Sequence, residues 1–344
     1  MHYFCTYFDS KYLIHGLALH ESLKRHCPEF RLWVLCLDQI TYDRIREKQI
    51  PSLVPISLAD LERFEPELAK VAKNRKKSEF CFTCTPCLPL YILEHYSEVD
   101  LITYLDADLF FFSDPSPLYR EMAGQSIMII PHHYAHDPQM QERLYGIYNV
   151  GWVSFRRDPE ALNCLQRWKE QCLESCPDMP RDGKYGDQKY MDEWPRRYRH
   201  IAILKNRGAN LAPWNVEGCK VEEKNGNLMV NGESIVFFHF SALRRVKSWI
   251  YTHGFSKSRR MPSRFIKMRI YAPYLETLKA IDDEEKKPVF TLSPKALVKN
   301  GKYFDLSACF TLGQRELKSF LSVLMKMLKG KCVFVWKRAV LSRK

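Results

Sequence analysis

Apolar residues gather along the first hundred positions in two recurring patterns, short continuous runs and longer segments with helical spacing. Continuous runs predict buried strands at 2–8, 31–37 and 54–56, because strands buried on both faces of a parallel sheet are apolar almost throughout. Helical spacing or a charged helical composition predicts helices at 12–25, 42–48, 58–77 and 86–96. Strands that alternate with helices indicate an α/β fold built on a parallel sheet with right-handed crossovers.

A further apolar run, 101–105, ends at two acidic residues, Asp106 and Asp108. Side chains i and i+2 of an extended chain point to the same face, so we expect the two carboxylates to converge at the carboxyl edge of the sheet. Open α/β folds bind their ligands at that edge. Because two like charges so close together are costly, a divalent cation would neutralise them and bridge to a diphosphate. A solvated pair at the end of a strand is the alternative.

One histidine and a basic cluster extend this candidate site. His239 follows the apolar run 235–238, and a neutral imidazole there would supply a nitrogen ligand, although a hydrogen-bonded core histidine fits the same pattern. Arg244, Arg245 and Lys247 come next. Cations at this point suit the negative charge that grows on a departing diphosphate, whereas the alternative is an exposed basic turn. The two commonest phosphate cradles, G-x-G-x-x-G and the Walker loop, are absent.

The segment Tyr104-Leu105-Asp106-Ala107-Asp108, followed by Ser113-Asp114-Pro115, resembles the signature of GT-A glycosyltransferases. The resemblance is closest to glycosyltransferase family 8, the galactosyltransferase and glycogenin-like group, and to its bacterial relatives. Other segments resemble family motifs in the expected order: Thr6-Tyr7-Phe8-Asp9 through Tyr12, Tyr148-Asn149-Val150-Gly151, Gly186-Asp187-Gln188 and Phe238-His239-Phe240. The resemblance covers about residues 1–255 and implies a Rossmann-like, mixed, mainly parallel sheet flanked by helices.

The resemblance also implies a role for each matching residue. The ligands of Mn²⁺ or Mg²⁺ would be Asp106, Asp108 and His239. The nucleotide of a nucleotide-diphosphate sugar would be framed by Thr6, Tyr7, Asp9, Tyr12 and Asp106. The transferred sugar would meet Asn149, Asp187 and Gln188. The diphosphate would meet either Arg245, which stands six positions after the histidine as in the family, or Lys247, which keeps the family's Lys-x-Trp pattern.

Some of these residues have simpler interpretations. Asp187 precedes a predicted helix and would suit a helix cap, and Asn149 would suit a turn at a strand end. The aromatic, amide-rich loop 210–215 would either stack on sugar rings or pack within the protein. The histidines His132, His133 and His136 would line the acceptor side.

Three cysteines, Cys81, Cys84 and Cys87, have a C-x2-C-x2-C spacing. Zinc and iron–sulfur sites want a fourth ligand, and here the three residues fall along one helical face just before the apolar segment 88–93. We therefore expect them to be buried, structural and reduced.

The net charge of +13 is concentrated at one end of the chain. From Lys257 onward there are 21 basic and 7 acidic residues, so the preceding part is nearly neutral. We therefore divide the chain into a transferase domain, 1–255, and a basic extension, 256–344, with 282–287 as an exposed loop. An amphipathic helix predicted at 314–329 suits an anionic membrane surface, or else packs on the main domain. A nucleic-acid reader would carry its charge on the folded domain, so nucleic acid is not an expected partner.

Together these features predict a metal-dependent glycosyltransferase of the hexosyltransferase class that acts on a glycan or lipid-linked acceptor. The resemblance implies retention of anomeric configuration. The basic extension suggests a role in bacterial envelope polysaccharide or lipopolysaccharide synthesis. The alternatives are a haloacid-dehalogenase-like phosphatase, which uses the same Asp-x-Asp motif, and a non-catalytic membrane-surface scaffold. The sequence has no apolar run of transmembrane length and no signal segment. We therefore expect a cytoplasmic protein, or one held peripherally on the inner face of the cell membrane.

Overall fold

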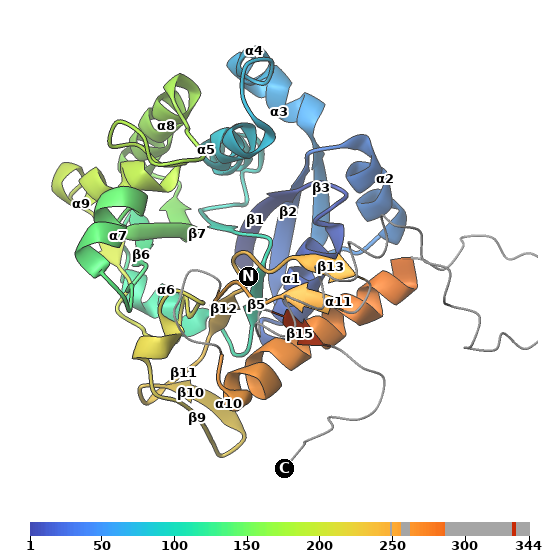
Figure 1. The fold of residues 1–344 in the computed structure, drawn as a ribbon. Coiled ribbons are helices and arrows are strands. Elements are labelled where there is room, and N and C mark those ends of the chain that lie inside the picture. The colour runs from blue at the N-terminus through green and yellow to red at the C-terminus, as the bar shows by residue number, and fades with distance from the viewer. Residues whose placement is uncertain (248–249, 256–261, 286–331, 335–344) are drawn as a thin grey trace, which may run out of the picture. The chain divides into compact units, whose positions relative to one another are not determined.

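A computed structural model describes residues 1–247, 250–255, 262–285 and 332–334. The chain divides into two compact units, Met1–Ser241 and Ala242–Lys344 (Figure 1).

The first unit is built on a seven-stranded sheet with the order β3-β2-β1-β4-β7-β6-β8. Its strands are β1 (His2–Phe8), β2 (Phe30–Cys36), β3 (Leu53–Ser57), β4 (Leu101–Leu105), β6 (Ile127–Pro131), β7 (Tyr148–Arg156) and β8 (Ile201–Ile203). The strands from β3 to β4 are parallel, whereas β7 runs antiparallel to both β4 and β6, and β8 is parallel to β6. This mixed, mainly parallel sheet confirms the expected fold class.

Helices cover both faces of the sheet. They are α1 (Leu13–His26), α2 (Gln39–Lys48), α3 (Leu58–Phe64), α4 (Glu67–Val71), α5 (Lys77–His95), α6 (Ser116–Met122), α7 (Pro138–Tyr145), α8 (Pro159–Glu174) and α9 (Trp194–Arg197), with 3-10 helices η1 (Gln188–Glu193) and η2 (Val216–Gly218). On one face α5 and α8 pack against each other and close a core that includes Trp33, Tyr104 and Phe155. On the other face Trp152 stacks on Phe237 at a centroid distance of 5.6 Å.

Two predicted helices differ from the structure. The charged stretch 58–77 is not one helix, because it breaks at Pro66 between α3 and α4. The helix expected from Pro86 already begins at Lys77 and continues through Pro86 and Pro89. An interior proline costs a helix roughly 3 kcal/mol, and the buried contacts of α5 with α8 and the sheet offset that cost. Cys84 and Cys87 are fully buried, as expected, whereas Cys81 is partly exposed. All three are free thiols.

Two small sheets complete the first unit. β5 (Leu109–Phe111) pairs antiparallel with β12 (Phe237–His239), and His239 lies opposite Leu109. β9 (Val221–Lys224), β10 (Asn227–Val230) and β11 (Glu233–Ser234) form an antiparallel meander. The β5–β12 pair matters for the site, because it carries a histidine from late in the chain to the residues that follow β4.

The second unit contains an antiparallel sheet of β13 (Arg245–Lys247), β14 (Ile250–Thr252) and β15 (Cys332–Phe334). Its helical part comprises α10 (Arg264–Ile266), the π-helical segment Lys267–Tyr271 and α11 (Ala272–Glu285). The prediction of an exposed loop at 282–287 is wrong for residues 282–285, which the structure describes. There α11 continues through Glu285, and Asp282 is buried. Asp282 forms an ion pair with Arg245 at 2.9 Å. This partner compensates the cost of burying the Asp282 carboxylate.

The amphipathic helix predicted at 314–329 lies outside the described residues, so it stays a prediction. Among the residues that are described, no helix is both long enough and apolar enough to cross a membrane.

Candidate metal and donor site

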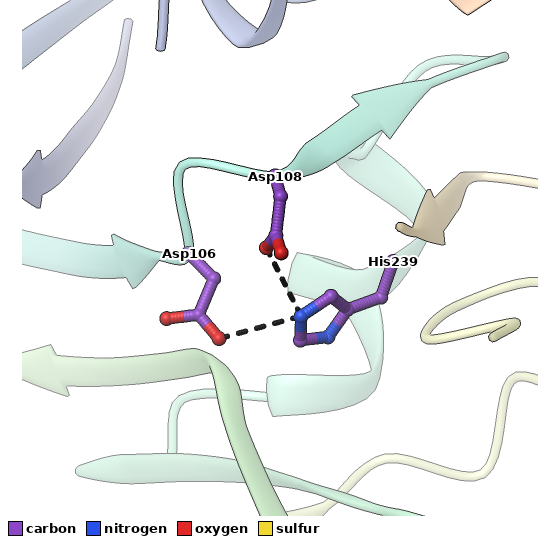
Figure 2. Close-up of side chains that lie close together, drawn as sticks. All are labelled: Asp106, Asp108 and His239. Atoms are coloured by element: carbon purple, nitrogen blue, oxygen red, sulfur yellow. Dashed lines mark ion pairs between the residues drawn. The ribbon is translucent and has the colours of Figure 1, made fainter. Parts of the chain in front are cut away.

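Asp106 and Asp108 stand at the carboxyl end of β4, in a turn rather than in extended chain. The turn is closed by a hydrogen bond from the Leu109 amide to the Asp106 carbonyl at 3.2 Å. Both carboxylates nevertheless face the same space (Figure 2). The two carboxylates therefore converge as expected. The turn brings them together, however, and not the alternation of side chains along an extended strand.

His239 completes a cluster of three possible metal ligands. Its Nε2 lies 3.1 Å from Asp108 Oδ1 and 3.5 Å from Asp106 Oδ2, as Figure 2 shows. One ligand atom from each residue falls within 4.8 Å of the other two. The imidazole is buried whereas the two carboxylates are partly exposed. Solvent therefore reaches the cluster from the side of Asp106 and Asp108.

The electrostatics of this cluster favour a cation. Burial raises the pKa of Asp106, against the effect of His239, and the neighbouring Asp108 raises it further. Burial would also raise the pKa of Asp108, but the charge of His239 and its hydrogen bond hold it below its usual range. Burial would lower the pKa of His239, and the two carboxylates outweigh burial and raise it. A proton is thus held among the three groups, in the position where a divalent ion with two oxygen ligands and one nitrogen ligand fits.

Asn149 and Gln188 lie directly behind the imidazole. Asn149 Oδ1 is 3.2 Å from His239 Nδ1, and Asn149 Nδ2 is 3.3 Å from Gln188 Oε1. Asn149 belongs to β7 and is buried, so the alternative of a turn at the end of a strand is wrong. Gln188 in turn donates to the Tyr145 carbonyl at 2.8 Å. The structure therefore brings two of the three expected sugar residues to the metal cluster.

Asp187, the third expected sugar residue, is 2% exposed. Its side chain makes no capping hydrogen bond within the described part of η1, so the helix-cap interpretation is not supported. Among the described residues its Oδ2 has no hydrogen-bond partner. Burial, opposed by a hydrogen bond from Thr85 and reinforced by the charge of Asp106, raises the pKa of Asp187 to about 7. The protonation state of a buried carboxyl with an unpartnered oxygen changes readily when a charged ligand binds beside it.

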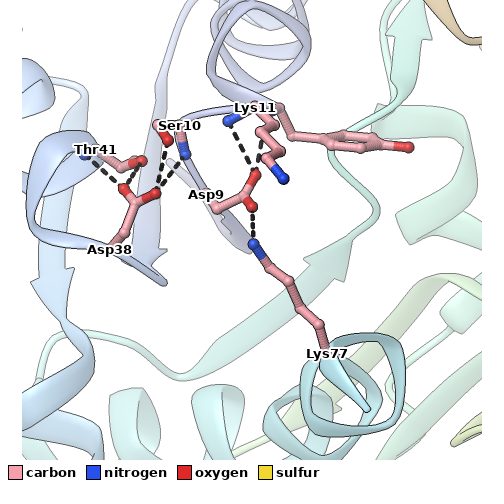
Figure 3. Close-up of polar contacts among 7 residues, drawn as sticks. Asp9, Ser10, Lys11, Asp38, Thr41 and Lys77 are labelled. Carbon is pink, nitrogen blue, oxygen red and sulfur yellow. Dashed lines mark hydrogen bonds and ion pairs between the residues drawn. The ribbon is translucent and has the colours of Figure 1, made fainter.

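The predicted nucleotide residues form the end of β1 and the loop after it. Asp9 accepts hydrogen bonds from the amides of Lys11 at 3.0 Å and Tyr12 at 3.2 Å, and its other oxygen pairs with Lys77 (Figure 3). Thr6 is fully buried, and its hydroxyl has no partner among the residues described. The Tyr7 hydroxyl and Thr85 Oγ1 are in hydrogen-bond contact at 3.3 Å.

The same loop is fixed on its other side by Asp38, which caps α2 through the Thr41 amide. The Asp38 carboxylate also accepts from the amide and the hydroxyl of Ser10 (Figure 3). Four hydrogen bonds hold the pKa of Asp38 at about 2, against the opposite effect of burial. Sequence reasoning missed both Asp38 and Lys77. The capping spacing of Asp38 before Thr41 was a readable signal, whereas the pairing of Lys77 with Asp9 had none.

The remaining predicted residues divide between the two units. Trp214 packs edge-on against His239 at a centroid distance of 5.1 Å, and its Nε1 donates to the His132 carbonyl at 3.0 Å. These contacts favour the packed interpretation of the loop 210–215. Arg245 belongs to the second unit, where it pairs with Asp282. Lys247 ends β13 in the same unit, so a role for either cation at the diphosphate stays a prediction.

Comparison with known proteins gives relatives by sequence and by fold, although no family model matches the chain. The protein YfnD of Bacillus subtilis is 30% identical over 290 residues, which cover 82% of this chain and 90% of YfnD. YfnF of the same organism is 32% identical over 253 residues, which cover 71% of this chain and 82% of YfnF. Both are named as uncharacterised proteins.

By fold, the chain is similar to the galactosyltransferase LgtC, solved in complex with donor and acceptor sugar analogues. The TM-score is 0.52 at 12% identity, and the match covers 85% of this chain and 98% of LgtC. The likeness shows the GT-A fold. The chain therefore belongs to the family of YfnD and YfnF, and it has the GT-A fold of the glycosyltransferases that it resembles.

Proposed function

We propose that this protein is a metal-dependent glycosyltransferase that moves a hexose from a nucleotide-diphosphate sugar to a glycan or lipid-linked acceptor. The observation that carries the proposal is the meeting of Asp106, Asp108 and His239 at the carboxyl edge of the sheet. In open α/β folds this edge is where ligands bind. A cluster of two carboxylates and one imidazole is a donor set for a divalent cation and has no evident structural purpose there.

Mn²⁺ or Mg²⁺ would be held by Asp106, Asp108 and His239. Carboxylates suit both ions, and the imidazole favours Mn²⁺ over Mg²⁺, which prefers oxygen ligands and water. When bound, the ion would neutralise the charge that grows on the departing diphosphate. The Tyr104 hydroxyl donates to Asp106 Oδ1 at 2.9 Å, which leaves Oδ2 directed at His239 and at the position of the ion.

The nucleotide would be framed by Thr6, Tyr7, Asp9 and Tyr12, at the end of β1. Tyr12 is 42% exposed, so its ring offers an accessible aromatic face. Lys77 adds a cation that is already directed at Asp9. A phosphate group of the donor would compete with Asp9 for the Lys77 ammonium. Lys77 is therefore a third candidate, with Arg245 and Lys247, to bind the diphosphate.

The sugar would be met by Asp187, Gln188 and Asn149. An oxocarbenium-like transition state carries positive charge, which an ionised Asp187 would stabilise. Because burial raises the pKa of Asp187 to about 7, its carboxyl is partly protonated at neutral pH. Positive charge that develops on the sugar would favour the ionised carboxylate. We extend the proposal to retention of anomeric configuration on the resemblance to glycosyltransferase family 8.

For the acceptor, we propose a glycan or a lipid-linked sugar in the synthesis of envelope polysaccharide or lipopolysaccharide. The basic segment 256–344 supports a peripheral position on an anionic inner membrane surface. The two alternatives have less support. The similarity of the fold to that of the galactosyltransferase LgtC favours a transferase over a phosphatase. A scaffold without activity has no need of a cation cluster or of a buried carboxylate with one unpartnered oxygen.

The test is the thermal stability of the full chain with a panel of nucleoside diphosphates and nucleotide sugars, each with and without Mn²⁺. A ligand that binds only the folded state stabilises it by about 2.7 kcal/mol at a hundredfold excess over Kd. We expect one nucleotide to raise the melting temperature only when Mn²⁺ is present, and the variant Asp108→Asn to lose that increase. A well-folded protein that no nucleotide stabilises would contradict the proposal.

A further inference from the structure

We propose that Asn149 is a positioning residue for the metal site: it fixes His239 in the tautomer that carries its proton on Nδ1, so that Nε2 is the ligand atom. The inference rests on the proposed function only in that the cluster takes a cation. This role is distinct from the sugar contact proposed for Asn149 above.

The orientation of the Asn149 amide follows from its neighbours. The Gly151 amide donates to Asn149 Oδ1 at 3.1 Å, so this atom must be the carbonyl oxygen. The other end of the amide, Nδ2, lies 3.3 Å from Gln188 Oε1 and 3.2 Å from His132 Nε2. Both contacts are satisfied only if Nδ2 is the donor. Three independent neighbours therefore agree on one orientation.

The tautomer of His132 agrees with this orientation. His132 Nδ1 lies 3.3 Å from the Ile147 carbonyl, which is an acceptor only, so Nδ1 carries the proton and Nε2 is free to accept from Asn149. Burial lowers the pKa of His132 to about 3, so the ring is neutral at physiological pH. His132 therefore lies behind the metal cluster and supports Asn149, whereas the sequence suggested that it lines the acceptor side.

The tautomer of His239 follows in the same way. Its Nδ1 lies 3.2 Å from Asn149 Oδ1, an acceptor, so Nδ1 must carry the proton. A neutral His239 then directs the bare lone pair of Nε2 at Asp108 Oδ1 and Asp106 Oδ2, 3.1 and 3.5 Å away. Three acceptors that face one another need a cation between them. Metal-bound histidines generally donate their second N–H in this manner, and loss of the acceptor costs roughly 10–100-fold in metal affinity.

Gly151 provides the space for this arrangement. A Cβ atom at Gly151 would lie 2.6 Å from Asn149 Oδ1 and 2.9 Å from His239 Nδ1, closer than carbon approaches either atom without displacement. Any side chain at Gly151 would therefore push the imidazole away from Asn149. The Asn-x-Gly pattern in β7 thus has a physical reason within the metal site, because one residue orients the ligand and the other makes room for it.

The test measures Mn²⁺ affinity of the full chain from the electron paramagnetic resonance of free Mn²⁺, with and without a nucleoside diphosphate and with no sugar present. Asn149→Leu keeps the size of the side chain and removes the acceptor, and we expect it to weaken Mn²⁺ binding by about 10–100-fold. Asn149→Asp keeps an acceptor for His239 Nδ1 and should retain most of the affinity. Unchanged affinity in Asn149→Leu would overturn the inference, even if transfer of the sugar were lost.

A second measurement needs no variant. The ¹⁵N chemical shifts of the His239 ring in the metal-free protein report its tautomer, above the pH at which the ring loses its second proton. We expect the form protonated on Nδ1, and the form protonated on Nε2 would overturn the inference. If the wild-type protein bound no Mn²⁺ at all, the proposed function would fail, while the tautomer measurement would still decide the role of Asn149.

Discussion

The Tyr104 hydroxyl donates a hydrogen bond to Asp106 Oδ1 over 2.9 Å, from the strand that ends at this aspartate. Tyr104 is 1% exposed and Asp106 is partly exposed, so the bond joins the core of the sheet to the metal cluster. It stabilises the ionised carboxylate and orients it, because a hydroxyl that donates to a carboxylate favours the charged form.

We expect Tyr104→Phe to weaken Mn²⁺ binding several-fold at pH 6 and less at pH 8. Without the hydroxyl the pKa of Asp106 rises further, so protons compete more strongly with the metal at low pH. The loss of one hydrogen bond should cost about 1 kcal/mol of folding stability. Calorimetric titration with Mn²⁺ at both pH values checks the prediction. Tyr96→Phe, a change in a tyrosine outside the site, is the control. Equal effects of Tyr104→Phe at the two pH values would contradict the argument.

Metal binding itself should depend on pH in the same direction. The pKa of Asp106 is raised by burial and the pKa of His239 is raised by its two carboxylate neighbours. Both groups bind a metal only after they have lost their protons. Affinity should therefore rise with pH, by up to about tenfold per pH unit for each proton released, and become constant once both groups are deprotonated. A Mn²⁺ affinity that is the same at pH 5.5 and pH 8 would contradict the assignment of these ligands.

Two adjacent lysines at the start of α5 offer a matched pair for the donor side. Lys77 pairs with Asp9, and Lys76 pairs with Asp178 at 2.8 Å. Their side chains are 62% and 66% exposed, so water and salt screen both ammonium groups. We expect Lys77→Met to weaken nucleoside diphosphate binding by about tenfold, the loss of one charge-assisted contact. Lys76→Met should leave binding unchanged. The same loss in both variants would indicate a general effect of charge and not a contact of Lys77.

Much of this fold could be predicted from local patterns. The strands β1 and β4 have almost continuous apolar runs, which buried central strands require, and the acidic pair was recognisable because it follows such a run. The direction of β7 could not be predicted, because an apolar run has the same appearance in parallel and antiparallel strands. The start of α5 was also hidden, since Pro86 argued against a helix that only its packing against α8 makes favourable.

The cluster of possible ligands was predicted on partly incorrect grounds. The convergence of Asp106 and Asp108 was expected from the repeat of a strand, whereas a turn provides it. The hydrogen bond between Asn149 and His239 joins residues far apart in sequence. The pairing of β7 with β4 and of β12 with β5 brings them together. Conversely, the acidic end of α11 was read as a loop from its charges alone, without the Arg245 partner that lets Asp282 be buried.

Asp187 gives a prediction on stability that is separate from metal binding. Its pKa is about 7 in the folded protein, mainly because of burial, and about 3.9 in an unfolded chain. The folded state therefore holds the proton more tightly, so the contribution of Asp187 to stability falls as the pH rises from about 4 to about 7 and changes no further above that range. Asp187→Asn removes this titration. Relative to the wild type, we expect the variant to gain stability with rising pH, by at most about 4 kcal/mol at pH 8, as three pKa units of about 1.36 kcal/mol allow.

Chemical unfolding of the metal-free wild type and of Asp187→Asn at pH 5 and pH 8 measures this difference. Asp182→Asn, whose side chain is 81% exposed in the wild type, is the control and should show no such change with pH. If Asp187 also acts on the sugar, the variant that is more stable at pH 8 should be the less active one, because a residue held at a cost to stability is retained for its function. A difference in stability that does not change between the two pH values would mean that the carboxyl is ionised throughout, and that its environment is more polar than its burial indicates.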